Sequence, residues 1–254
     1  MGAALVLGYA PDAATAQARA TWTGFYLGAN AGYQWGDGNR SLSLMPDLAT
    51  WLADSPDFAQ FQNGYGTSPS GFLGGAQLGF NWQSGTIVFG IETDFSWLNA
   101  ESSTERSAMV TDTLSNTYLV RASLRQELDW LGTLRARIGL LPFSNQSLMV
   151  YLTGGLAYGR VSTSHEFKDV AANSGFVGSS SSTDVGGTVG GGLEWAAHDG
   201  WTLKAEYLYY DLGGRTVAGN HFNNPAPPQF GADVHYDTQG HIVRVGVNYR
   251  LGGL

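Results

Sequence analysis

The sequence contains no cysteine. This absence excludes disulfide bridges, thiolate metal sites and cysteine nucleophiles. Charged residues are also scarce: they make up 13% of the 254 residues, about half the usual share. The 13 lysines and arginines stand against 21 acidic residues, a formal net charge of −8. This balance argues against nucleic acid as a partner, because phosphate binding requires clustered basic side chains.

Long hydrophobic runs are missing as well. No apolar run in the sequence approaches the ~20 residues that a membrane-spanning helix requires. The longest lies in residues 1–18, MGAALVLGYAPDAATAQA, and ends on the small-x-small pattern Ala16-Gln17-Ala18. An apolar stretch before such a pattern is typical of a signal peptide and its cleavage site. We therefore predict that residues 1–18 are the remnant of a signal peptide and that residues 19–254 form a single domain.

Alternation is the dominant pattern from Trp22 onward. Apolar and polar residues alternate with the period of two that is typical of β-strands. The alternating segments are 24–35, 72–83, 87–97, 128–140, 148–158, 188–197, 201–209 and 241–251. These eight segments have about the ~9–11 residues with which a tilted strand crosses a bilayer. Short links of turn residues alternate with long links at about 37–71, 99–126, 160–187 and 211–240, which is typical of outer-membrane barrels.

The aromatic residues decide between a membrane barrel and a β-sandwich, which alternates in the same way. When the segments are threaded up and down, tryptophan and tyrosine gather at two levels. The ring at the short-turn end contains Trp22, Trp82, Trp195, Trp201 and Tyr249, and the ring at the long-link end contains Trp35, Trp97, Trp130, Tyr158 and Tyr209. Two such rings around an aliphatic band are the girdles of a membrane barrel.

We therefore predict an all-β fold: an eight-stranded antiparallel transmembrane β-barrel with short periplasmic turns and long extracellular loops. Both termini then lie in the periplasm. The expected surroundings are outer-membrane lipid and lipopolysaccharide, and the expected folding partner is the barrel-assembly machinery. The sequence does not indicate an oligomeric state.

The opening WTGFYLGANAGYQWG carries a family resemblance. It resembles the first strand of small Gram-negative porin-like surface antigens, the outer-membrane immunogenic proteins. VRVGVNYRL is similar to their last strand, and GGLEW with WTLKAEYLYYDLGG to their sixth and seventh. The resemblance covers roughly residues 22–251. It implies an eight-stranded barrel, surface exposure, antigenicity and a structural role in the envelope, and some members bind haem or act as porins. The chain departs from the family by ending on Gly252-Gly253-Leu254 instead of an aromatic residue.

The polar face of the strands carries an unusual set of charges. Its acids are Glu92, Asp94, Asp129, Glu194 and Glu206, and its bases are Arg135, Arg137, Lys204, Arg244 and Arg250. An eight-stranded barrel is just wide enough for its side chains to fill it. Unpaired charges inside it would cost several kcal/mol each. We predict a plug of paired charges that seals the lumen, and a narrow ion path is the alternative.

Other candidate sites lie in the long links. The candidate haem or metal ligands are His165, His221, His235, Tyr236 and His241, since histidine and tyrosine can ligate haem iron. No spacing among them defines a metal site, so we interpret them as solvated residues and predict no cofactor. Ser179–Ser182 is interpreted as a flexible loop tip, and no motif groups serine, histidine and carboxylate for catalysis.

The first long link is too apolar for a solvated loop. Its segment PDLATWLADSPDFAQFQNGYG begins at Pro46. We predict a short amphipathic helix on the barrel rim or in the lipid headgroups, with a partner-binding surface as the rival interpretation. The predicted function is structural and surface-exposed, without catalysis. The alternatives are a small-solute or haem-handling porin and a lipid-modifying enzyme.

Overall fold

The computed structural model describes residues 21–37, 40–51, 69–112, 114–223 and 232–251. The predicted signal peptide and the last three residues lie outside this description. The elements in chain order are β1 (Gly24–Gly36), β2 (Arg40–Leu44), α1 (Pro46–Trp51), β3 (Ser70–Ser84), β4 (Ile87–Thr111), β5 (Thr117–Leu140), β6 (Leu148–Asp169), β7 (Ser174–Ala196), β8 (Trp201–Ala218), β9 (Asn220–Phe222) and β10 (Ala232–Leu251).

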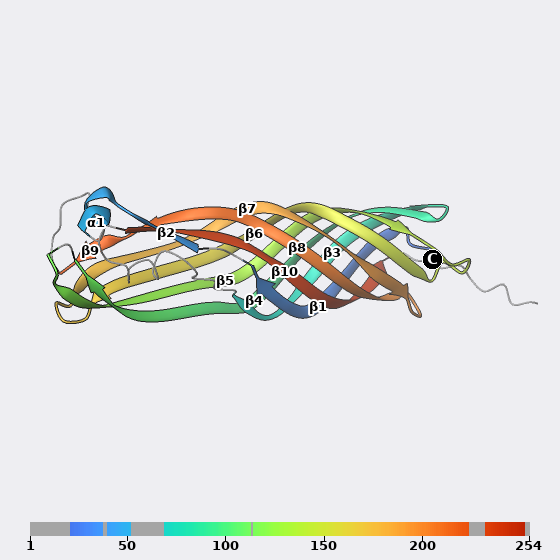
Figure 1. Ribbon diagram of the computed structural model, residues 1–254. Helices are drawn as coiled ribbons and strands as arrows, with labels where there is room; N and C mark the ends of the chain where they lie inside the picture. Colours follow the sequence, from blue (N-terminus) through green and yellow to red (C-terminus); the bar gives the residue numbers. More distant parts are fainter. Residues whose placement is uncertain (1–20, 38–39, 52–68, 113, 224–231, 252–254) are drawn as a thin grey trace, which may run out of the picture.

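Eight of these strands form a closed antiparallel ring (Figure 1). The ring runs β1-β3-β4-β5-β6-β7-β8-β10, and β10 pairs with β1 from Phe25↔Leu251 to Gly36↔Gly240. Closure satisfies the backbone groups of the first and last strands, so no sheet edge is left to face lipid. The predicted eight-stranded antiparallel barrel is confirmed. Within the described ranges, no helix has the length and hydropathy of a membrane-spanning segment.

The strands extend far beyond the predicted segments. β4 and β5 stay paired to Thr111↔Thr117, and β6 and β7 to Asp169↔Ser174. The links predicted at 99–126 and 160–187 are therefore mostly strand, which corrects the sequence-based bounds. Ser179–Ser182 likewise lies within β7 and is not a loop tip. These extensions escaped detection because their outward residues are largely serine, threonine and charged residues instead of apolar ones.

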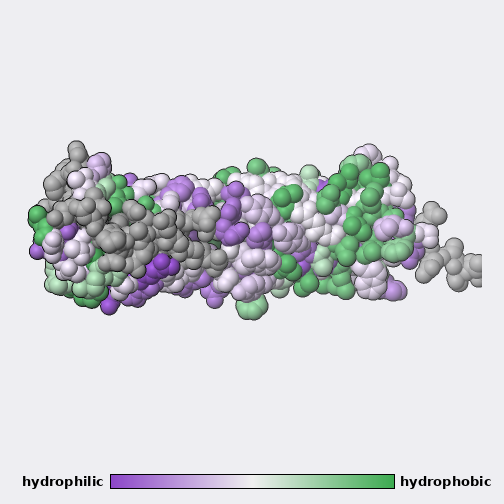
Figure 2. Space-filling view, in the orientation of Figure 1, coloured by the Kyte–Doolittle hydropathy of each residue, from purple (hydrophilic) through white to green (hydrophobic). Residues whose placement is uncertain are grey.

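The barrel has two halves of opposite character. In the half that contains the short turns, apolar side chains face outward, for example Phe72 at 76% and Leu152 at 69% exposure, and polar ones face inward. Figure 2 shows hydrophobic residues gathered toward this end of the visible face. In the other half the arrangement is reversed, and the buried core consists of Val110, Ala122, Leu124, Phe167, Phe176, Val217, Ala232, Val234 and Tyr236. That half, which we call the outer half for its distance from the short turns, therefore resembles a water-soluble barrel.

The end of the barrel opposite the short turns carries the remaining elements. There β10 pairs with β2, and β9 pairs with β7. Helix α1 begins at Pro46, as predicted for the rim helix, and lies at the same end (Figure 1). Residues 52–68, which contain the rest of the predicted helix, lie outside the described residues.

Candidate functional site

Eight buried charged side chains meet inside the half of the barrel that contains the short turns, which we call the membrane half for its apolar exterior. They are Glu92 and Asp94 on β4, Arg135 and Arg137 on β5, Glu194 on β7, Lys204 and Glu206 on β8, and Arg244 on β10. We call them the charge layer. Three strands contribute residues at i and i+2, which point to the same side of a strand. Each of the eight is at most 4% exposed.

Arg135 lies at the centre of the charge layer. Its Nη2 donates to Glu92 Oε1 at 2.5 Å and to Asp94 Oδ2 at 3.0 Å, and its Nη1 donates to Glu206 Oε1 at 2.9 Å. One guanidinium thus contacts three carboxylates, using the fork of N–H donors that suits arginine to this role. Removal of this side chain would leave four buried acids facing three buried bases, although Arg244 still contacts Asp94 and Glu206.

The other bases complete the pairing. Arg244 donates to Glu206 Oε2 at 2.7 Å and to Asp94 Oδ1 at 3.0 Å. Lys204 Nζ contacts both oxygens of Glu92, at 2.8 and 2.9 Å. Arg137 Nη1 contacts Glu194 Oε2 at 2.9 Å. Four acids and four bases therefore neutralise one another within a few ångströms, which offsets the cost of removing them from water.

Neutral side chains supply further hydrogen bonds to the acids. The Tyr26 hydroxyl donates to Glu92 at 2.7 Å, and the Tyr151 hydroxyl donates to Glu206 at 2.9 Å. Both rings also contact the Arg137 guanidinium, at 4.7 and 5.3 Å from their centroids. Sequence reasoning did not assign these two tyrosines to the site. A signal was present for Tyr151, which interrupts the alternation of its strand because it faces inward.

Apolar layers cover the charge layer on both sides. Toward the short turns lies a buried cluster of Trp22, Val88, Leu141, Met149, Tyr151 and Ala196. Toward the other half lies a cluster of Leu73, Ala100, Leu128, Leu131, Ala157, Val161, Leu208, Tyr210, Leu212 and Ile242. The lumen of the membrane half is thus filled by a sequence of apolar, charged and apolar layers.

Two predicted members do not belong to the charge layer. Asp129 faces outward and lies 3.5 Å from Arg160. The prediction for Asp129 is wrong because a bulge between Leu128 and Trp130 shifts the phase of β5. Arg250 lies at the short-turn end, with its guanidinium 5.7 Å from the Trp22 ring centroid. It is outside the ion-pair network found among the described residues.

The aromatic rings are placed largely as expected, with one correction. Trp22 is completely buried inside the barrel, and its Nε1 donates to the carbonyl of Gln146 at 2.9 Å. It precedes β1, so strand alternation does not determine its direction. The other predicted girdle residues face the exterior: Trp35, Trp82, Trp97, Trp130, Tyr158, Trp195, Trp201, Tyr209 and Tyr249. Neighbouring members touch, for example Trp201 and Tyr249 with centroids 5.1 Å apart.

The structure brings two of the five candidate haem ligands together, His165 and Tyr236, whose Nδ1 atom and hydroxyl oxygen lie 3.4 Å apart. His165 and Tyr236 are buried inside the outer half, with ring centroids 6.4 Å apart. His235 faces the exterior beside Asp237, while His241 stacks on Trp35 in the aromatic ring. His221 packs edge-on against Phe176. No group of three potential metal ligands was found in the described part of the chain. The interpretation of the candidates as solvated residues is wrong for His165 and Tyr236, which are 2% and 1% exposed.

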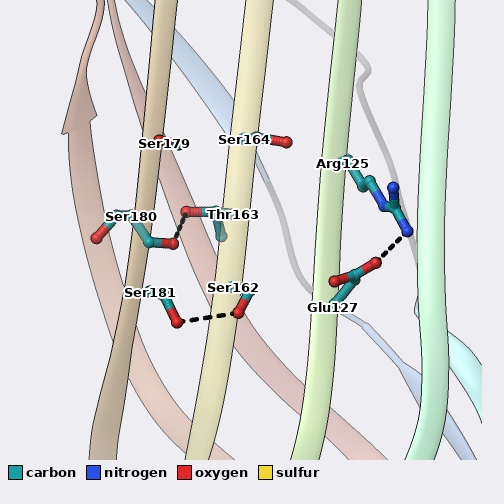
Figure 3. A pocket seen from close by; sticks show the side chains of 8 residues that line it. All are labelled: Arg125, Glu127, Ser162, Thr163, Ser164, Ser179, Ser180 and Ser181. Atoms are coloured by element: carbon teal, nitrogen blue, oxygen red, sulfur yellow. Dashed lines mark hydrogen bonds and ion pairs between the residues drawn. The ribbon is translucent and has the colours of Figure 1, made fainter.

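A polar depression lies on the outer surface over β5, β6 and β7 (Figure 3). Its volume is about 280 Å³, and it is lined by Arg125, Glu127, Ser162, Thr163, Ser164, Ser179, Ser180 and Ser181. The serines face one another across the β6–β7 ladder, and the hydroxyls of Ser162 and Ser181 are 3.1 Å apart. Small side chains on both strands leave this space between the flanking larger residues.

The closed ring, the exterior apolar band and the buried charges together define a transmembrane β-barrel. The chain matches the family described as outer membrane protein beta-barrel domain over residues 2–250, and it belongs to that family. It is 36% identical over 234 residues to the 31 kDa outer-membrane immunogenic protein of Brucella melitensis, covering 91% of this chain and 84% of that protein. The predicted family resemblance and outer-membrane location are thereby confirmed.

More distant relatives have similar descriptions. The 22 kDa outer membrane protein of Rhizobium leguminosarum is 27% identical, with 75% of this chain and 64% of that protein covered. Among solved structures, the outer membrane protein OprG of Pseudomonas aeruginosa aligns over 92% of this chain and 99% of its own, with a TM-score of 0.46 and 14% identity.

Proposed function

We propose that the protein is a structural, surface-exposed barrel of the outer membrane whose lumen is closed to solutes. The charge layer is the observation that carries this proposal. Its acids and bases are buried and lie within 2.5–3.0 Å of their partners. Because each charge is compensated by protein groups, no continuous water column is needed to solvate the layer.

The apolar layers strengthen the seal. Trp22, Met149 and Tyr151 fill the lumen between the charge layer and the short turns, and Leu131, Leu208 and Ile242 fill it on the other side. An eight-stranded barrel has little space beyond that occupied by its own side chains. A hydrated ion would therefore have to displace apolar groups twice as well as break buried ion pairs.

We further propose that the outer half projects from the cell and that the termini lie in the periplasm. The exterior of that half carries paired charges such as Glu105–Arg121 and Glu101–Arg125, each 3.1 Å apart. These groups suit water and not hydrocarbon. The description of the relatives as immunogenic also supports an exposed half. Lipopolysaccharide and other outer-membrane lipid would surround the apolar band, with the barrel-assembly machinery as folding partner and no role for nucleic acid.

A role without catalysis is part of the same proposal. The buried acids of the charge layer are committed to ion pairs, which leaves none of them as an obvious general acid or base. His165 is buried on the inner side of the barrel wall beside Phe167 and Tyr236, and His198 lies in a turn beside Asp199. The haem-handling alternative loses its main support because the candidate ligands are dispersed.

Planar-bilayer conductance of the refolded protein tests the seal. We expect little or no steady conductance from the wild type, measured beside a known open porin as positive control. The matched variants are Trp22→Ala, which opens the apolar layer, and Arg135→Ala, which breaks the charge layer. Stable open-channel steps from the wild type, unchanged in both variants, would show that the lumen is an open pore and is not plugged.

A further inference from the structure

The barrel wall is interrupted between β7 and β8. Their ladder ends at Gly187↔Asp211, although β7 extends back to Ser174 and β8 continues to Ala218. Beyond that point β7 remains paired with β6, and β8 with β10. The two strands approach again at Gly178, where a Cβ would lie 2.6 Å from the Ala218 carbonyl oxygen. The interruption thus lies between two close contacts.

Inward-facing side chains of β7 are more exposed at the level of the interruption than above and below it. On β7, the inward-facing Ser180, Ser182 and Asp184 are partly exposed, whereas the inward-facing Phe176 above them and Thr188 below them are buried. Inward residues of the neighbouring β6 at the same level are also buried, with Thr163 at 6% exposure. The inner side of β7 is therefore less well covered where the β7–β8 ladder is missing than above and below it.

One arginine spans the interruption. Arg215 on β8 pairs through Nη2 with Asp184 on β7, and its Nη1 donates to the Ser180 hydroxyl at 3.3 Å. The Asp184 carboxylate also accepts a hydrogen bond from Ser182 at 3.0 Å. The Arg215 side chain is 37% exposed. These contacts replace the missing ladder with side-chain bonds.

The course of β8 explains how Arg215 reaches that position. Gly213 has φ +78°, a backbone conformation that residues other than glycine rarely adopt. Its N–H donates a hydrogen bond to the Asp211 carboxylate at 2.8 Å. This bend ends the regular ladder at Asp211. The strand therefore leaves β7 at a built-in kink and not through fraying at its end.

We propose that the interruption is a lateral window in the barrel wall, and that the Arg215–Asp184 pair is the latch that holds it shut. When the pair opens, small polar solutes enter the lumen at the level between two apolar clusters. One is the buried core of the outer half, and the other is the cluster that contains Leu131 and Leu208. This inference goes beyond the closed lumen. The window lies on the far side of Leu208 and Leu131 from the charge layer, so it provides a side entrance without a path through the membrane.

Thiol labelling tests the latch directly, because the sequence contains no cysteine that would react in the background. Thr163→Cys places one thiol on the buried inner side of β6, beside Ser180 in the ladder. A small, charged, membrane-impermeant methanethiosulfonate should label it slowly in the otherwise wild-type protein. We expect labelling to become several-fold faster with Asp184→Asn or with Arg215→Gln.

Matched controls separate a window from general loosening. Ser162→Cys places the thiol on the exterior of the same strand. Its labelling rate should be the same with and without Asp184→Asn. Glu105→Gln breaks the exposed pair with Arg121 and should leave Thr163→Cys slow. The swap of Asp184→Arg with Arg215→Asp should restore slow labelling. Each variant is checked for folding by its gel mobility before boiling.

Two results would overturn the proposal. One is a labelling rate for Thr163→Cys that neither Asp184→Asn nor Arg215→Gln changes in folded protein. The other is an equal increase with Glu105→Gln, which would show that any lost ion pair loosens the wall. Neither result depends on conductance, so the lateral window and the closed lumen fail independently.

Discussion

Glu92 and Arg135 are direct cross-strand partners on β4 and β5, and the Arg135 Nη2 atom lies 2.5 Å from Glu92 Oε1. Both side chains are buried, at 2% and 1% exposure. The register of one strand pair therefore places an acid directly beside a base. The same residues contact β8 through Lys204 and Glu206, so the charge layer joins strands that are far apart in the sequence.

Arg135→Ala and Glu92→Ala should both destabilise the barrel strongly. Each removes one charge from a balanced network of four acids and four bases and leaves a net buried charge, and breaking a fully buried pair costs about 3–5 kcal/mol. Thermal unfolding in detergent measures the loss. The matched control is Glu105→Ala, whose side chain is 59% exposed in its pair with Arg121 and should change stability little. Equal effects of the buried and exposed substitutions would contradict the assigned pairing.

Trp22→Ala should destabilise the barrel through a cavity in the apolar layer at its short-turn end. Truncation of a buried aromatic typically costs about 3–5 kcal/mol, and here the bond from Nε1 to the Gln146 carbonyl is also lost. Trp82→Ala is the control, since that ring is 59% exposed on the exterior. Thermal unfolding of both variants decides the point. A larger loss of thermal stability from Trp82→Ala than from Trp22→Ala would contradict the assignment of Trp22 as the buried ring.

Closure of the ring should make the protein resist detergent. From Phe25 to Trp35, every residue of β1 is paired with both β3 and β10, so local opening in the membrane half exposes polar groups to an apolar medium. An unheated sample should therefore migrate differently from a boiled one on a denaturing gel. Deletion of residues 241–251 removes most of the segment of β10 that pairs with β1 and should abolish this difference. A persistent shift without this segment would be incompatible with closure by β10.

The sequence predicts the barrel because two signals agree. Period-two alternation locates the membrane segments, and the aromatic residues mark their ends at two levels. Both signals depend on an apolar exterior, so they fade beyond Trp97 and Tyr158, where the exterior becomes polar and the core moves inside. The length of the strands in that half follows from backbone pairing, which hydrophobic periodicity does not report.

The candidate site was predicted where the phase of a strand is regular. Glu92, Asp94, Arg135 and Arg137 lie in the part of the β4–β5 ladder that precedes its irregularity between Trp97 and Ala100, and their inward direction follows from parity alone. The direction of Asp129 does not follow from parity, since a single-residue bulge reverses the phase of its strand. The contact between His165 and Tyr236 joins residues 71 positions apart and depends on how β6 and β10 face each other across the lumen, which a single sequence does not specify.

His165 should make stability depend on pH. Burial, opposed by the nearby Asp233 carboxylate, lowers the pKa of His165 from 6.5 to about 4. Its ring packs in the apolar core of the outer half beside Tyr236. The folded protein therefore holds the neutral imidazole, whereas the unfolded chain binds a proton below pH 6.5.

The sign follows from proton uptake. Between pH 6.5 and about 4, the unfolded state binds more protons than the folded state, so the free energy of unfolding falls as the pH falls. Unfolding of the wild type and of His165→Leu should be compared across this window. The variant should lose less stability on acidification, because its side chain does not titrate. His198→Ala is the control, since that side chain is 95% exposed, and it should keep the wild-type dependence. Parallel pH curves for the wild type and His165→Leu would show that this histidine is already protonated, or accessible to water, in the folded barrel.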